Sequence, residues 1–119
     1  MAINIENFII KRNDTLPALV VRVKTRGDID EIIPFNLSGV TATTFSMTDN
    51  YNNLKVSSSP AQILCASGGT LQYSWLTGDT DEAGKFSGEF EMLFSDGNKM
   101  SIPTNGAITI QVIKDINET

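Results

Sequence analysis

Acidic side chains are the main groups with which this chain of 119 residues could bind metals or transfer protons, because it contains no histidine. A Ser-His-Asp triad, a Cys-His pair and a histidine-ligated metal site are therefore excluded. Carboxylates concentrate in Asp28-Ile-Asp30-Glu31 and in Asp79-Thr-Asp81-Glu82. Either segment could offer oxygen ligands to calcium, or one half of a glycosidase-type pair, but neither has the spacing of an EF-hand loop. We expect solvated loop charges, and we nominate no catalytic, metal-binding or cofactor-binding residue.

The single cysteine and the glycines are also expected to serve structure. Cys65 has no partner for an internal disulfide, and its setting between Ala61 and Ala66 predicts a buried strand residue. No phosphate-cradling loop is present, and turns at expected strand ends account for Gly27, Gly39, Gly68-Gly69 and Gly84, which stand singly or in one pair.

Aromatic residues raise the question of carbohydrate binding, because flat aromatic faces contact sugars well. Tyr73 and Trp75 alternate with polar residues, which favours a place in a core. Tyr51 lies in a polar segment from Asp49 to Asn53 and is the better candidate for an exposed contact. Local packing of that loop is the alternative interpretation.

The net charge of −5 and the isoelectric point near 4.5 oppose a nucleic-acid partner, since phosphate binding needs a surface rich in Lys and Arg. Basic residues cluster early and acids later, so parts of the fold could carry opposite signs and suit head-to-tail packing; a mixed solvated surface is the alternative. No apolar stretch has the length of a membrane span and the amino terminus lacks a signal-peptide pattern, so we expect a soluble protein with no membrane partner.

Alternation with period two dominates the chain and predicts strands that are half buried. In the clearest case, Phe86 to Phe94, one face holds Phe86, Gly88, Phe90, Met92 and Phe94, while the other holds Ser87, Glu89, Glu91 and Leu93. The same pattern, with its core-facing residues, recurs at Phe8 and Ile10; Leu19, Val21 and Val23; Thr43, Phe45 and Met47; Leu71, Tyr73 and Trp75; and Ile108, Ile110 and Val112.

Turn residues separate these segments at intervals of about ten residues, which is typical of a β-sandwich. Asp96-Gly97 and Asn105-Gly106 predict tight hairpins, so residues 86–94, 100–103 and 107–113 should form a meander. Residues 79–84 combine a capping residue, early acids and a final glycine, which indicates a single helical turn.

These elements predict one all-β domain over residues 1–119, with a core from about 5 to 115. The expected architecture is an immunoglobulin-like antiparallel β-sandwich of about seven to nine strands. Glu82, Gly84 and Phe86 match the spacing of the corner between strands E and F in such domains. Phe86 lacks the hydroxyl group of the usual corner tyrosine, and Gly88 stands where a disulfide cysteine would be.

Motifs of turn and core residues occur in a fixed order along the chain. The first half contains Phe8-Ile-Ile-Lys11-Arg-Asn-Asp14-Thr15-Leu16-Pro17, Asn36-Leu37-Ser38-Gly39-Val40-Thr41 and Phe45-Ser-Met47. The second half contains Tyr73-Ser-Trp75, Asp79-Thr80, Ala83-Gly84-Lys-Phe86, Glu89-Phe90, Phe94-Ser-Asp96-Gly97 and Ile102-Pro103. Over about Ile5 to Asp115, this set resembles the N-terminal domains of baseplate upper proteins from phages and prophages.

The resemblance implies a non-enzymatic structural subunit of a tailed-phage virion, in the baseplate, tail or neck. Such a subunit would bind other phage structural proteins, in multiple copies within a symmetric assembly, through a sheet edge and the arm from Met1 to Glu6. The family domain often precedes a stalk or receptor-binding part, so a chain that stops at Thr119 favours an adaptor, collar, tail or head-decorating role. A host-surface glycan-binding or receptor-binding module and a capsid decoration protein are the alternatives, and an enzyme would need a converging carboxylate pair.

Overall fold

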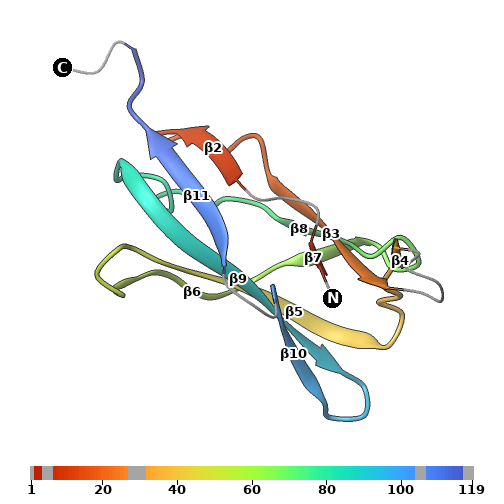
Figure 1. Ribbon diagram of the computed structural model, residues 1–119. Helices are drawn as coiled ribbons and strands as arrows, with labels where there is room; N and C mark the ends of the chain where they lie inside the picture. The colour runs from red at the N-terminus through yellow and green to blue at the C-terminus, as the bar shows by residue number, and fades with distance from the viewer. Residues whose placement is uncertain (1, 4–6, 27–31, 104–106, 117–119) are drawn as a thin grey trace.

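All regular structure in the described part of this protein is β-structure (Figure 1). The computed structural model describes residues 2–3, 7–26, 32–103 and 107–116, in which eleven strands form two sheets. Two of these strands, β1 and β4, have only two and three residues, and without them nine remain of the seven to nine expected. The predicted all-β, immunoglobulin-like sandwich is confirmed.

The first sheet has five strands, four of which follow the order β1-β3-β8-β7, while β4 also pairs with β3. In an immunoglobulin-like domain this path corresponds to strands A, B, E and D. The strands are β1 (Ala2–Ile3), β3 (Leu19–Arg26), β4 (Ile32–Pro34), β7 (Gln62–Cys65) and β8 (Thr70–Tyr73).

The second sheet has six strands, in the order β2-β11-β9-β5-β6 with β10 also paired to β9. Its central strands correspond to G, F and C, and β6 to the strand that variable-type domains add beside C. The strands are β2 (Asn7–Lys11), β5 (Val40–Thr48), β6 (Leu54–Pro60), β9 (Gly84–Phe94), β10 (Lys99–Ile102) and β11 (Ile108–Ile113).

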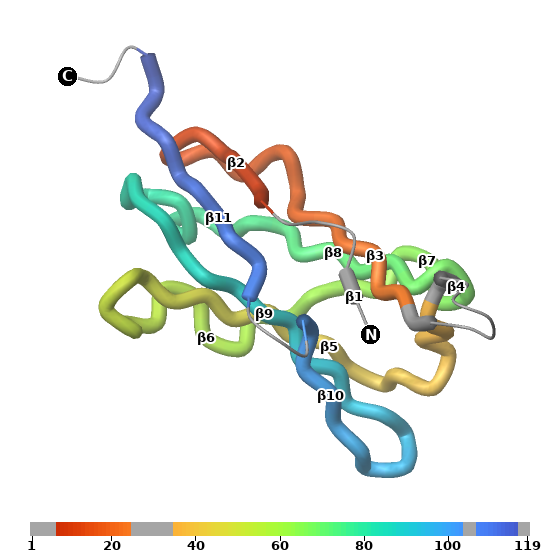
Figure 2. Tube along the Cα trace, viewed as in Figure 1, coloured from red at the N-terminus to blue at the C-terminus, as the bar shows by residue number. Residues whose placement is uncertain are grey.

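Two features of the pairing differ from the expected antiparallel meander. The hairpin of β9 and β10 forms as predicted, but β11 pairs with β9 rather than with β10. Because β9 is eleven residues long, one of its edges holds β10 along 90–93 and β11 along 84–88, while β5 occupies the other edge. In addition, β2 lies beside β11 and runs parallel to it (Figure 2). The predicted turn at Asn105-Gly106 lies outside the described residues.

The helical turn predicted at 79–84 is wrong. Residues 77–80 form a turn closed by the Asp79 N–H, which donates to the Leu76 carbonyl (3.0 Å), and β9 begins at Gly84. The carboxylate of Asp79 accepts from groups that precede it in sequence, the Leu76 N–H (2.9 Å) and the Tyr73 hydroxyl (2.5 Å). A helix cap would instead accept from N–H groups that follow it, so the acid fixes a turn rather than starting a helix.

The core lies between the sheets and contains the inward sets that alternation predicted, all of them buried except Phe94, which is half-buried and packs against the core. Its centre is aromatic. The Phe45 ring stacks on Tyr73 with centroids 4.6 Å apart and meets the edge of Trp75 at 5.7 Å. Phe90 lies 5.1 Å from Phe45 and Phe8 lies 5.9 Å from Trp75. Such aromatic pairs add to the stabilisation that burial itself provides.

Candidate functional site

The acidic segment from Asp79 to Glu82 does not converge on a site. Asp79 fixes its own turn, Glu82 is exposed, and Asp81 forms an ion pair with the Lys55 ammonium group. The hydrogen bond from Lys55 lowers the pKa of Asp81, and the nearby charge of Arg12 lowers it further. Within the described ranges, no three His, Cys, Asp or Glu side chains gather as metal ligands would. The segment from Asp28 to Glu31 lies outside those ranges.

Arg12, Lys55 and Thr80 instead tie this connection to the rest of the fold. Arg12 Nε donates to the Asp81 carbonyl (2.7 Å), and the Thr80 hydroxyl donates to the Asp14 carbonyl (2.7 Å). Thr80 is buried, whereas Asp81 beside it is exposed. The contacts of Arg12 and Thr80 join segments more than sixty residues apart, so the polar groups of this region position the β8–β9 connection.

Tyr73 is the one strongly perturbed titratable group among the described residues. Burial raises the pKa of Tyr73 to about 12, and its hydrogen bond to the Asp79 carboxylate acts in the same direction. The ring is fully buried in the aromatic core. A phenol held protonated in this way is a structural anchor.

Cys65 is exposed, which corrects the prediction of a buried thiol. The physical reason is its position at the end of β7, an outer strand of its sheet, just after a register shift against β8 between Ile63 and Cys65. The hydroxyl group of Ser67, whose Oγ lies 3.7 Å from Sγ, and the N–H of Gly68 lower the pKa of Cys65. The thiol is therefore accessible to reagents and partly activated.

Of the aromatic candidates, Trp75 and Tyr73 belong to the core as predicted, whereas Tyr51 is 85% exposed. The loop of Tyr51 is held by Asp49, whose carboxylate accepts from the N–H groups of Tyr51 (2.8 Å) and Asn53 (3.0 Å). The bond from Asn53 lowers the pKa of Asp49. Beside the loop lies an open hollow of about 270 Å³, which Glu82 and Lys85 also line.

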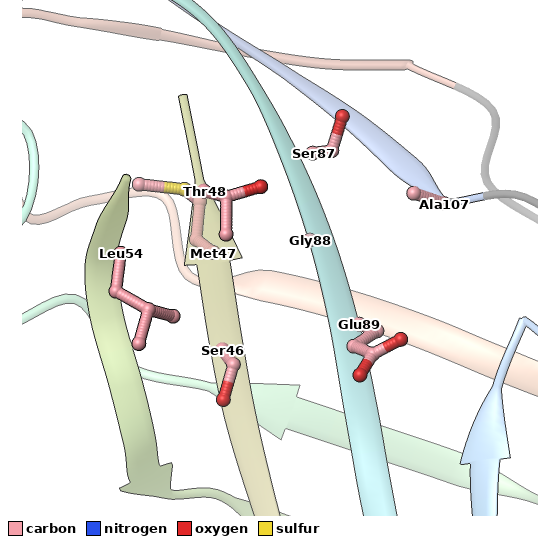
Figure 3. Close-up of a pocket in the computed structure, with 8 residues that line it drawn as sticks. All are labelled: Ser46, Met47, Thr48, Leu54, Ser87, Gly88, Glu89 and Ala107. Carbon is pink, nitrogen blue, oxygen red and sulfur yellow. The ribbon is translucent and has the colours of Figure 1, made fainter. Parts of the chain in front are cut away.

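A second hollow of about 270 Å³ lies on the outer face of the six-stranded sheet (Figure 3). Ser46 on β5 and Ser87 and Glu89 on β9 form its polar part. Leu54, at the start of β6 and 63% exposed, and Ala107 contribute apolar surface. Sequence patterning placed Glu89 on this outer face, but the hollow arises from the pairing of distant strands.

The sheet edges differ in how they are protected against further pairing. Charged residues, prolines and bulges discourage edge strands from pairing with other chains. β2, β6 and β10 each contain a lysine, β4 contains a proline, and β6 also has a proline and register shifts. In the described part of the chain β7 pairs only with β8 and has neither lysine nor proline, so a register shift between Ile63 and Cys65 is its one such protection; it exposes 52% of Leu64. Val56 to Gly78, which includes β7 and β8, contains no charged residue.

The amino-terminal arm, expected to pair with a neighbouring subunit, is partly engaged within its own chain. Ala2 and Ile3 pair with Lys24 and Val23 of β3. Residues 1 and 4–6 lie outside the description. The described part of the chain contains no helix with the length and apolar character that crossing a bilayer would require.

No protein-family model matches the chain, and no curated protein matches it. Among solved structures, the crystal structure of CopC from Methylosinus trichosporium OB3b is similar, with a TM-score of 0.54 over 96% of this chain and 90% of that chain. The two sequences are 14% identical over this alignment. At that identity the likeness concerns the fold, and it shows that the chain shares its all-β architecture with CopC.

Proposed function

We propose that this chain is a non-enzymatic structural subunit of a tailed-phage virion, mounted in the baseplate, tail or neck. The observation that carries the proposal is the outer edge of β7, which pairs with no strand among the described residues and has a register shift but no charge or proline to discourage pairing. Such an edge suits β-strand addition by a partner protein, in which main-chain hydrogen bonds provide affinity and the exposed Leu64 provides selectivity. The order of motifs from Phe8 to Pro103 supports the choice of a phage assembly as the setting.

The roles of the polar residues are consistent with this proposal. The carboxylates of Asp79 and Asp81 are engaged in a turn and an ion pair, and the tyrosine with the raised pKa is anchored in the core. The surfaces that remain for binding a partner protein are the outer faces and the edges of the two sheets.

The test is the protein composition of purified particles from the phage or prophage that encodes the chain. Mass spectrometry should detect the chain in the particle fraction, and immunogold labelling should place it at the tail or neck. Labelling over the capsid would instead assign a decoration protein. Absence from particles in which other tail and capsid proteins are detected would contradict the proposal.

A host-surface glycan-binding module is the second candidate, because Tyr51 is 85% exposed beside an open hollow that also contains Glu82 and Lys85. An aromatic face with neighbouring hydrogen-bonding groups is the usual means of holding a sugar ring. A glycan array should then give hits that Tyr51→Ala, in the loop between β5 and β6, removes and that Leu64→Ala, on β7 of the other sheet, retains. An array without hits would reject this candidate.

A further inference from the structure

We propose that copies of this chain stack face to face, with the outer face of the five-stranded sheet of one copy lying on the outer face of the six-stranded sheet of the next. The inference adds a contact to the one proposed at β7, it rests on the proposed function for the need of many copies, and the partner at these faces is a second copy. Two matched rows of side chains, one on β3 and one on β9, carry it.

The row on β3 is apolar at one end and basic at the other. Val20, Arg22 and Lys24 alternate with the buried residues of this strand and point away from the core; Val20 is 39% exposed. β8, which pairs with β3, and β7, the next strand along the sheet, contain no charged residue. In the described part of this sheet, the outer face therefore carries positive charge and no acid to neutralise it.

The row on β9 has the complementary order. Ser87, Glu89 and Glu91 alternate with Phe86, Gly88 and Phe90 and are exposed on the outer face. The hollow with Leu54 on its wall lies beside Ser87 and Glu89 (Figure 3). This row therefore begins at a partly apolar depression and continues with two acids.

The spacing of the two rows is the same, because both use alternate residues of a strand. Side chains two residues apart on one strand are separated by about 6.6 Å. When Arg22 of one copy faces Glu89 of the next, Lys24 faces Glu91 and Val20 faces the hollow. Among the described residues, none of these four charged side chains makes an ion pair or a hydrogen bond within its own chain.

Lysines of β9 and β10 flank the two acids on this face. Lys85 continues the same alternation two residues before Ser87 and lies about 13 Å from Glu89 along the strand. Lys99 is opposite Leu93, beyond the end of the row. The centre of the row is therefore acidic, and an arginine that approaches Glu89 is attracted by Glu89 and Glu91 more strongly than it is repelled by the two lysines.

A contact between two different faces is heterologous, so each copy can bind a neighbour on both sides. Repetition of such a contact gives a closed ring or an open tube, which are the forms that a virion component takes. Each copy carries a net charge of −5, so copies repel one another in general and depend on the matched rows for close approach.

Sedimentation equilibrium of the purified full chain at low ionic strength tests the contact. The unaltered chain should associate with increasing concentration and dissociate as salt is added. Arg22→Glu and Glu89→Arg should each weaken association about tenfold or more, because each places like charges in contact. The double variant Arg22→Glu/Glu89→Arg should restore association to within about threefold of the unaltered chain, because the pair is again opposite in sign.

The matched control is Glu82→Arg, which reverses an exposed charge outside the two rows and should change the dissociation constant by less than about twofold. Circular dichroism confirms that each variant is folded, and the pair Lys24→Glu and Glu91→Arg repeats the exchange at the next position.

A chain that is monomeric at every concentration, or a double variant that associates no better than the single variants, overturns the inference. If the chain is present in virions but monomeric when purified, the contact is rejected and the proposed function is kept. If the purified chain associates but is absent from virions, the contact is kept and the proposed function is rejected.

Discussion

The ring of Phe45 lies directly against Gly88 on the neighbouring strand of the sheet. A Cβ atom at residue 88 would come 2.8 Å from Cζ of Phe45 and 2.7 Å from Cδ1 of Ile110, which is closer than van der Waals contact allows. In disulfide-linked immunoglobulin domains this position on strand F holds a cysteine. Here the space is filled by the aromatic ring on strand C, so packing does the work of holding the sheets together.

Gly88→Ala should lower the free energy of unfolding by about 1–3 kcal/mol, because the added methyl group overpacks a core that has no room for it. Urea denaturation followed by the fluorescence of the buried Trp75 measures the change. Gly39→Ala is the matched control, since a Cβ there meets only Cδ2 of Phe94 at an ordinary 3.7 Å. Equal stability of the two variants would contradict the account of the Phe45–Gly88 contact.

Tyr73→Phe should lower stability by about 1–2 kcal/mol at neutral pH, because the Asp79 carboxylate loses the hydroxyl group that donates to it. It should also change the response to alkali. The pKa of Tyr73 is raised to about 12 in the folded chain, so the unfolded state loses this proton more readily and stability falls as the pH rises from about 10 to about 12.

In Tyr73→Phe this contribution to the alkaline loss of stability should be absent, and urea midpoints measured from pH 9 to pH 12 test it. Tyr51→Phe is the control, because it removes a hydroxyl group from an exposed side chain. If the unaltered chain and Tyr73→Phe lose stability in parallel over this range, Tyr73 does not couple folding to the proton.

Cys65 should react with a thiol reagent such as Ellman's reagent in the folded protein, one thiol per chain and without denaturant. Its exposure provides access, and the Ser67 hydroxyl lowers the pKa of Cys65, which increases the thiolate fraction. Ser67→Ala should slow the reaction near neutral pH, and the rates should converge at high pH, where both thiols are ionised. A reaction that requires denaturant would show that the thiol is buried after all.

Period-two alternation predicted the core residues of β2, β3, β5, β8, β9 and β11 because a strand with one buried face leaves that pattern whatever its partners are. Which strands pair with one another leaves no such local pattern in the sequence. The parallel contact of β2 with β11 and the return of β11 to β9 depend on contacts between residues far apart in sequence, and no local turn signal specifies them. The same limit explains the wrong helical turn, since Asp79 accepts a hydrogen bond from the buried Tyr73.

For the same reason, only part of the candidate surfaces could be predicted from the sequence. The outward charges of β3 and β9 follow directly from alternation, so Arg22 and Glu89 could be placed on outer faces from sequence. The hollow beside Glu89 needs Leu54 of β6 and Ala107, which only the folded sheet brings near it. Cys65 was misplaced because an apolar neighbourhood resembles a buried strand, whereas β7 is an outer strand at which the register shifts.

Quantitative mass spectrometry of density-purified virions from the encoding phage or prophage tests the central claim most directly. A structural subunit in a symmetric assembly should co-purify with the particles through successive gradients, at a constant ratio to the other tail proteins and in several copies per particle. A chain that is abundant in the infected cell but is lost from the particles during purification would contradict the account.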